Sequence, residues 1–402
     1  MKTKFNSKLA NDMIVIVSTC EDSWGGSEEL WSRSIAFFQS KGLQVTVFKK
    51  KIPQEHYQFD LLHEQGVQLK SLLPAEGRKK GLFRQFGSVF STNKSADGAG
   101  GDKKRPWFLQ AEDVDNFEAE IKNLRPRLVI ISQAINFDGL AYGHVCNIYN
   151  IPYVIVCHKA VDFYWPEPGD RPAMRRVFQD ARACYFVSTH NKRLTEEQFG
   201  LRLPHGEVIF NPLKVSKKIP FPDSHTTGWK LCCIGRLFVL DKGQDMLLRV
   251  LSKPKWKKRP LHVSFVGSGR DEVGLKEMAN LLELTNVSFL GQVQDIEAVW
   301  KHHHALILPS RSEGLPLTIV EAMKVGRPII TTDAGGSAEL LEDGVNGFIA
   351  QSNEDSIDST LERAWARRED WETLGANASN HVASVLPEVP ERDFVDNLLT
   401  FI

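Results

Sequence analysis

Residues 309–347, PSRSEGLPLTIVEAMKVGRPIITTDAGGSAELLEDGVNG, constrain the fold of this chain more than any other stretch. The short apolar run at 305–308 that precedes them predicts a buried strand. Pro316 suits the first turn of a helix, because proline lacks the N–H that a first turn leaves unbonded. Gly326 ends this helix, and the run 328–332 predicts the next strand. The stretch therefore predicts a strand, a loop, a helix and a second strand.

Two glutamates, Glu313 and Glu321, bracket this strand–loop–helix corner. In an open α/β sheet such a corner faces the crevice where ligands bind. The free N–H groups of the first helical turn suit an oxyanion such as a phosphate, whereas a carboxylate accepts hydrogen bonds from hydroxyls. A nucleotide sugar needs both kinds of contact. On spacing alone, however, two glutamates eight residues apart are more often a helix cap and a solvated face.

The whole stretch decides between these interpretations. E-G-L-P-L-T-I-V-E-A-M, followed by G-R-P-I-I and G-G-S-A-E-L, resembles the E-x7-E signature of the retaining glycosyltransferases of family 4. The resemblance implies an α/β protein of the GT-B fold, with two Rossmann-like domains whose parallel sheets face a central cleft. It implies that Glu313 contacts the hydroxyls of the donor sugar and that Glu321 contacts the ribose diol. The pair Gly335–Gly336 is expected to open a further helix. The residues expected to line the donor site between the glutamates are Gly314, Leu315, Pro316, Leu317 and Thr318.

A second motif lies earlier in the same predicted domain, in LCCIGRLFVLDKGQDMLLRVL at 231–251. It predicts a strand at 231–234 and a helix at 244–251, and Arg236 and Lys242 flank the loop between them. Two cations at such a junction suit a diphosphate, although ordinary surface charge is the alternative. The G-R-L…K-G pattern again resembles family 4, which implies that both side chains bind the donor pyrophosphate and stabilise the departing charge.

The N-terminal half begins with a predicted strand at 13–18, a loop containing W-G-G-S-E-E and a helix at about 28–40. Gly25 and Gly26 would let the backbone approach an anion at the helix N-terminus, or would form only a tight turn. The resemblance implies a glycine loop near the donor phosphates and the acceptor.

Another predicted strand, at 153–157, ends at His158. A histidine at the carboxyl end of a parallel strand faces the ligand crevice, and the resemblance implies that it contacts the donor sugar. The neighbouring Phe163, Tyr164 and Trp165 either stack on an acceptor sugar or pack against the protein. The residues expected to be catalytic are thus Arg236, Lys242, Glu313 and His158.

Composition bounds the remaining possibilities. The 402 residues carry no net charge, so no global field favours nucleic acid or membrane, and we expect no nucleic-acid partner. Six cysteines without CxxC spacing predict buried thiols in a reducing compartment. No signal peptide is visible, so we expect a cytoplasmic protein. Twofold strand–helix alternation predicts two Rossmann-like domains, at 1–212 and 213–385. The resemblance implies that the first lies on the acceptor side and that the second binds the nucleotide sugar, and it implies a C-terminal helix at 386–402 that crosses back to the first domain.

A basic insertion is predicted at 71–106. Between residues 78 and 105, eight Lys or Arg residues face two Asp residues, a net charge of +6, with Leu, Phe and Val interleaved. This composition suits peripheral contact with an anionic membrane or a charged acceptor. A solvated insertion loop is the alternative.

Together with these patterns, the resemblance to family 4 implies a retaining, metal-independent hexosyltransferase that moves a sugar from a nucleoside diphosphate sugar to a carbohydrate or lipid-linked hydroxyl acceptor, in cell-surface polysaccharide or glycolipid synthesis. No cofactor and no metal site are expected, because the two cations serve the leaving group and no convincing DxD-like acidic pair occurs. A GT-B nucleotide-sugar epimerase and a catalytically inactive nucleotide-sugar-binding subunit are the alternatives. The sequence does not specify the sugar, the base, the acceptor or the oligomeric state.

Overall fold

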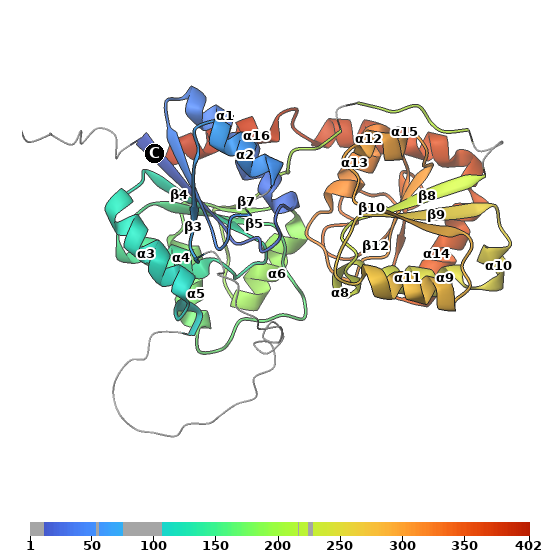
Figure 1. Ribbon diagram of the computed structural model, residues 1–402, viewed down its shortest axis with the longest axis horizontal. Coiled ribbons are helices and arrows are strands. Elements are labelled where there is room, and N and C mark those ends of the chain that lie inside the picture. Colours follow the sequence, from blue (N-terminus) through green and yellow to red (C-terminus); the bar gives the residue numbers. More distant parts are fainter. Residues whose placement is uncertain (1–11, 54–55, 75–106, 216, 224–227) are drawn as a thin grey trace, which may run out of the picture.

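Two parallel β-sheets, one in each of two α/β domains that lie side by side, build the structure (Figure 1). This computed structural model describes residues 12–53, 56–74, 107–215, 217–223 and 228–402. The GT-B class of fold predicted from the sequence is confirmed. The strands of the first sheet end at Val208 and those of the second begin at Trp229.

The first sheet has seven parallel strands in the order β3-β2-β1-β4-β5-β6-β7. Its order reverses between β1 and β4, the switch point at which doubly wound sheets bind ligands. The strands are β1 (Met13–Ser18), β2 (Gln44–Lys49), β3 (Gln68–Ser71), β4 (Leu128–Gln133), β5 (Tyr153–Cys157), β6 (Cys184–Phe186) and β7 (Gly206–Val208). The helices are α1 (Gly26–Ser40), α2 (Tyr57–Glu64), α3 (Glu112–Leu124), α4 (Leu140–Ile148), α5 (Arg171–Asp180) and α6 (Thr189–Phe199).

The second sheet has six parallel strands in the order β10-β9-β8-β11-β12-β13, and its switch point lies between β8 and β11. The strands are β8 (Trp229–Ile234), β9 (Leu261–Val266), β10 (Val287–Gly291), β11 (Ala305–Leu308), β12 (Ile329–Thr332) and β13 (Gly347–Ala350). The helices that follow Trp229 are α8 (Val239–Lys242), α9 (Gln244–Leu251), α10 (Pro254–Lys257), α11 (Glu272–Leu281), α12 (Ile296–Trp300), α13 (Leu317–Val325), α14 (Glu354–Ala366), α15 (Trp371–Val385) and α16 (Pro390–Leu398).

Strand β1 shows why both faces of these sheets are covered. Ile14 and Ile16 belong to one hydrophobic cluster, and Val15 and Val17 to another. Because successive side chains of a strand point to opposite faces, this unbroken apolar run buries both sides of the sheet under helices. The carboxyl end of β1 is therefore held in place between the two layers of helices that cover the sheet.

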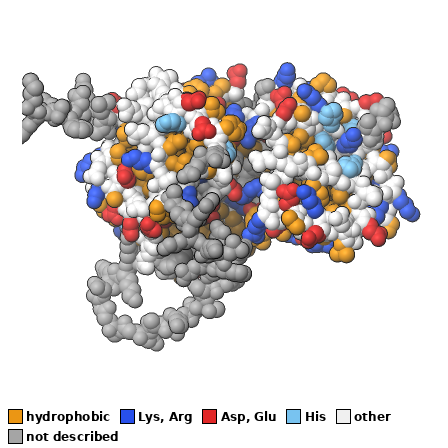
Figure 2. All heavy atoms as spheres, in the orientation of Figure 1, with side chains coloured by type: hydrophobic (Ala, Val, Ile, Leu, Met, Phe, Trp, Pro, Cys, Tyr) orange, Lys and Arg blue, Asp and Glu red, His pale blue; other side chains and the backbone are white. Residues whose placement is uncertain are grey.

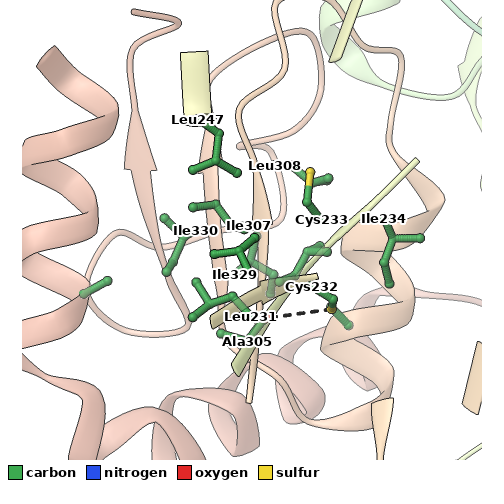
Figure 3. Packing of buried hydrophobic residues seen from close by; sticks show 14 of the residues in the cluster. Leu231, Cys232, Cys233, Ile234, Leu247, Ala305, Ile307, Leu308, Ile329 and Ile330 are labelled. Atoms are coloured by element: carbon green, nitrogen blue, oxygen red, sulfur yellow. Dashed lines mark hydrogen bonds between the residues drawn. The ribbon is translucent and has the colours of Figure 1, made fainter. Parts of the chain in front are cut away.

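The core of the second domain forms in the same way around β8, β11 and β12. Figure 3 shows Leu231, Ala305 and Ile329 packed in this cluster, with the Cys232 thiol donating to the carbonyl oxygen of Ala305 at 3.6 Å. All six cysteines are free and buried, which confirms that part of the prediction.

Helix α16 lies against α1 of the first domain (Figure 1). Its residues Phe394, Val395 and Leu398 are buried in the cluster that includes Ile14. The Tyr185 hydroxyl donates to the side-chain oxygen of Asn397. Helix α16 thus completes the core to which β1 contributes.

Two local predictions were wrong. Residues 335–340 form turns instead of a helix, because Gly335 has a φ of 60° and the local hydrogen bonds, such as Ser337 N–H to the Ala334 carbonyl, span only three residues. The expected insertion at 71–106 starts too early, since Ser71 ends β3 and Leu72 is buried in the core. The basic residues 78–105 and their expected membrane contact lie outside the described residues.

On the face drawn in Figure 2, acidic and basic side chains are interspersed over both domains, in keeping with the zero net charge. Within the described ranges, no helix combines the length and the apolar composition needed to cross a bilayer.

Candidate functional site at the domain interface

Glu313 lies in the loop between β11 and α13, as predicted, and is 6% exposed. Its carboxylate accepts a hydrogen bond from the Ser310 hydroxyl at 2.7 Å. The Lys242 ammonium donates to both of its oxygens, at 2.7 and 2.8 Å. The structure therefore joins two predicted site residues that are 71 positions apart in one ion pair.

Gly243 explains why Lys242 reaches this carboxylate. It has a φ of 62°, and a Cβ there would lie 2.1 Å from the carbonyl oxygen of Pro309. Only glycine allows so close an approach. The end of α8 is therefore pressed against the start of the Glu313 loop.

Arg236, the other predicted diphosphate ligand, follows β8 and points across the domain interface. Its guanidinium donates to the Asp22 carboxylate at 2.6 Å, and its other terminal nitrogen lies 3.9 Å from Asp241. Both Arg236 and Asp22 are about half exposed, so this pair contributes little to stability. It leaves the guanidinium accessible to a competing anion.

The first turn of α13 also suits an anion. Pro316 is its N-cap, without a side-chain hydrogen bond, and the turn holds no acidic residue. The N–H groups near Leu317 and Thr318 therefore lie at the N-terminus of the helix, and no acidic side chain of the same turn neutralises them. Gly26 of the first domain packs here, since a Cβ on it would lie 3.1 Å from the side chain of Leu317. The glycine loop and the α13 turn are thus in contact, as the prediction for the donor site requires. Leu315 packs beside them against the core of the second domain.

Glu321 lies within α13 and is 4% exposed. Burial raises its pKa to about 7, and the backbone N–H of Lys214, which donates to it at 3.3 Å, lowers that pKa by less. Near neutral pH this carboxyl is therefore poised between its protonated and ionised forms.

We expect nucleoside diphosphate affinity to rise from about pH 6 to about pH 8, because only the ionised Glu321 accepts hydrogen bonds from both hydroxyls of a ribose diol. The sign follows from the raised pKa, which keeps the carboxyl protonated below about 7. Calorimetry across this range should compare the wild type with Glu321→Gln, since the phosphates of the ligand titrate equally in both. Parallel pH curves for the two proteins would contradict the assignment.

His158 follows β5 directly, as predicted, and its backbone lies against the loop of the second domain that contains Glu313. A Cβ at Gly314 would lie only 1.9 Å from the carbonyl oxygen of His158. The imidazole Nε2 lies 3.2 Å from the Ser132 hydroxyl, and Nδ1 lies 3.5 Å from the side-chain nitrogen of Asn211. Burial lowers the pKa of His158 to about 4, so the ring is neutral at physiological pH.

We expect Gly314→Ala to lower kcat/KM about a hundredfold, because the methyl group would force the domains apart and a shift of about 1 Å costs that much in positioning. The clash is with the other domain, so rigid-body movement relieves it and the melting temperature should change little. Gly274→Ala is the matched control, since a Cβ there meets nothing within 4 Å. Wild-type kcat/KM in Gly314→Ala would show that the contact does not set the catalytic arrangement.

Sequence reasoning missed the buried ion pair that shapes the glycine loop. Glu28 is fully buried and accepts from the Ser18 hydroxyl at 2.9 Å, from the Trp31 indole at 2.7 Å and from Lys49 at 2.5 Å. The Lys49 ammonium also donates to the carbonyl oxygen of Cys20, which ties down the loop that leads to Gly25. The sequence signal for this ion pair was Lys49, a lysine at the end of the apolar run of β2.

A second missed contact lies between the domains. Lys159, next to His158, forms an ion pair with Asp241 at 2.9 Å. Glu339 accepts hydrogen bonds from the backbone N–H groups of Thr189 and His190, at 2.9 and 2.6 Å, at the start of α6. These contacts hold the carboxyl edges of the two sheets against each other. Among the residues that the structure describes, no group of three or more His, Cys, Asp or Glu side chains is placed to hold a metal ion.

Two parallel-sheet domains that meet at the carboxyl edges of their strands define a GT-B protein with a candidate site between its domains. Residues 228–366 match the family described as "Glycosyl transferases group 1". They contain Arg236, Lys242, Glu313 and Glu321, so the part of the site built by the second domain lies inside the matched region.

Relatives with curated descriptions agree with this match. An uncharacterized glycosyltransferase of Haemophilus influenzae is 35% identical over 122 residues, which are 30% of this chain and 34% of that protein. The O-antigen biosynthesis glycosyltransferase WbnH of Escherichia coli is 28% identical over 194 residues, 48% of this chain and 53% of that protein. The alignments thus span only about a third and a half of these two relatives. The solved structure of Anabaena HepE with UDP and glucose superposes with a TM-score of 0.69 at 18% identity, over 97% of this chain and 99% of that one.

Proposed function

We propose that this protein is a retaining glycosyltransferase that moves a sugar from a nucleoside diphosphate sugar to a hydroxyl acceptor in polysaccharide or glycolipid synthesis. The observation that carries the proposal is the Lys242–Glu313 pair, in a loop that meets the backbone of His158 at Gly314, with Arg236 pointing across the same interface. The O-antigen role in the name of WbnH and the UDP and glucose in the HepE structure support it.

In the proposed site, the donor diphosphate binds Arg236, Lys242 and the first turn of α13. It competes with Asp22 for the guanidinium and with Glu313 for the ammonium, and both are charge-assisted contacts that a phosphate makes well. Glu313 and His158 hold the sugar, while Glu321 holds the ribose. The cations stabilise the negative charge that develops on the leaving diphosphate.

Retention would follow from attack on the face that the diphosphate leaves. The bond from the anomeric carbon to the phosphate oxygen breaks, the bond to the acceptor oxygen forms, and the acceptor proton passes to the departing phosphate. A double displacement would need a carboxylate nucleophile at the anomeric carbon. Glu313 accepts a hydrogen bond from Ser310 and is assigned to the sugar hydroxyls, which leaves it poorly suited as that nucleophile, so we favour the same-face route.

Mass spectrometry of products from UDP-, GDP- and ADP-sugars over a panel of carbohydrate and lipid-linked acceptors tests this function. A transferase releases nucleoside diphosphate only when an acceptor is added and yields a glycosylated product. A nucleotide-sugar epimerase would change the donor without an acceptor, and an inactive subunit would bind the donor and change nothing. Either of those results would replace the proposal.

A further inference from the structure

A carboxylate in the first turn of α1 has partners in its own domain and in the segment that joins the two domains. Glu29 is 3% exposed. It accepts hydrogen bonds from the Trp24 indole at 3.0 Å and from the Arg33 guanidinium at 3.2 Å, and it forms an ion pair with the Lys214 ammonium at 3.2 Å. The proposed transfer step does not use Glu29, so these three contacts need another explanation.

Arg33 and Lys214 attach the interdomain segment to α1. This segment comprises residues 209–228, between β7 and β8. With the terminal nitrogen that does not contact Glu29, Arg33 donates to the backbone carbonyl oxygen of Leu213 at 3.1 Å. The backbone of Leu213 and the side chain of Lys214 are therefore both held by the same helix of the first domain.

Lys214 also contacts the residue assigned to the ribose. Its backbone N–H donates to Oε1 of Glu321 at 3.3 Å. Glu321 belongs to α13 of the second domain and, like Glu29, is nearly buried. One residue of the interdomain segment thus connects two nearly buried carboxylates from different domains. Glu29, Arg33, Lys214 and Glu321 form one group, the linker cluster.

The charges of the linker cluster act on Glu321 in opposite directions. Burial is the main reason why the pKa of Glu321 is raised to about 7, and the backbone N–H of Lys214 lowers that pKa. The positive side chains of Lys214 and Arg33 lower it further, whereas the negative charge of Glu29 raises it. The contacts that attach the interdomain segment therefore also affect the ionisation of Glu321.

Stability alone gives a poor account of this arrangement. The side chains of Arg33 and Lys214 are 38% and 52% exposed, and ion pairs made by such exposed cations contribute little to stability. A second carboxylate near Glu321 opposes its ionisation, which also does not favour the folded state. Charges placed against stability are expected where residues serve a ligand.

We propose that Glu29 and Lys214 are positioning residues for the nucleoside half of the donor, because they hold one oxygen of Glu321 in place and leave the rest of its carboxylate to the ribose hydroxyls. The first domain thereby controls the affinity of the second for a nucleoside diphosphate. Both residues lie outside the region 228–366 that matches the family. The inference rests on the proposed function, since it requires Glu321 to bind the ribose.

Calorimetry from about pH 6 to about pH 8.5 tests the effect of charge, with whichever of UDP, GDP and ADP binds the wild type most tightly. Lys214→Gln keeps the backbone N–H and can still donate to Glu29, but it removes a positive charge. We expect the pH of half-maximal affinity to rise by about half a unit or more, which is roughly a threefold loss on the acid side. Glu29→Gln removes a negative charge, so we expect the opposite shift. The double variant should lie near the wild type.

A nonpolar substitution tests positioning separately from charge. Glu29→Leu removes the acceptor for Lys214 and Arg33, so we expect affinity to fall by up to about tenfold even at about pH 8.5, where Glu321 is ionised. Glu29→Gln still accepts a hydrogen bond and should bind as the wild type does at that pH. The matched controls are Lys70→Gln and Glu120→Gln, which break an ion pair of 2.6 Å between β3 and α3 and should keep the wild-type profile.

Unshifted profiles in both Lys214→Gln and Glu29→Gln would overturn the inference, and so would equal shifts in the controls. A loss in Lys214→Gln that is the same at every pH would also overturn it, because it would indicate that the ammonium contacts the phosphates directly. Failure of the wild type to bind any of the three diphosphates would instead defeat the proposed function itself. Binding by the wild type with unshifted variants defeats only the linker cluster, so the two failures are distinguished.

Discussion

Lys242→Ala is expected to lower kcat/KM by a factor that corresponds to about 2–4 kcal/mol of transition-state stabilisation. The side chain lies at the end of α8 beside the loop of Glu313, where the donor diphosphate would acquire charge as it leaves. A cation placed in advance stabilises that charge without reorganising during the reaction. Steady-state kinetics with the donor identified by product analysis measure the loss.

A second effect of this substitution has to be separated from catalysis. Without the ammonium, the nearly buried carboxylate of Glu313 keeps the Ser310 hydroxyl as its one side-chain partner among the described residues, and a buried charge without its counter-ion is destabilising. Thermal unfolding of Lys242→Ala and of Lys242→Ala/Glu313→Gln reports on that cost. Lys253→Ala, which breaks the ion pair with Asp358 on the same domain, is the control for loss of a lysine. Wild-type kcat/KM in Lys242→Ala would remove Lys242 from the mechanism.

Glu313→Gln and Glu321→Gln are expected to affect different parts of one ligand. Glu321 is assigned to the ribose, so Glu321→Gln should weaken both the free nucleoside diphosphate and the intact donor. Glu313 is assigned to the sugar, so Glu313→Gln should weaken only the intact donor or lower kcat. A hydrogen bond to a charged group is worth about 1.5–3 kcal/mol, or roughly ten- to a hundredfold in affinity.

Calorimetry with both ligands on both variants measures this division. The Lys242 ammonium is released from its carboxylate partner in Glu313→Gln, so a modest gain in affinity for the free diphosphate agrees with the assignment. An equal loss of free-diphosphate affinity in both variants would contradict it, and the loop would then be only a structural cap.

The sequence predicted those parts of the fold and site that local patterns specify. Glu313 and Glu321 follow an apolar strand and enter a helix with a glycine stop, so their places on loop and helix are local properties of residues 309–347. His158 ends the apolar run of β5 for the same reason. The roles assigned to these residues remain predictions.

What the sequence did not predict depends on partners far along the chain. Asn211 follows β7 and His158 follows β5, and β6 separates these strands in the sheet, so the approach of the two side chains to 3.5 Å is not a local property of either segment. The incorrect helix at Gly335 has the same origin, because the backbone N–H of Gly336 bonds to the carbonyl oxygen of Gly314 at 2.6 Å and holds the chain in turns. From the sequence alone, the pair Gly335–Gly336 is compatible with the start of a helix, because the bond to Gly314 is not visible there.

The return of α16 to the first domain sets an order for folding during synthesis. Domains generally fold as the ribosome releases them, starting with the N-terminal one. Here Phe394, Val395 and Leu398 follow the second domain in the sequence, so the core of the first domain lacks them until the second domain has been made. A nascent chain that has completed residues 229–385 therefore still exposes apolar surface on β1 and α1, and α16 covers that surface when it emerges.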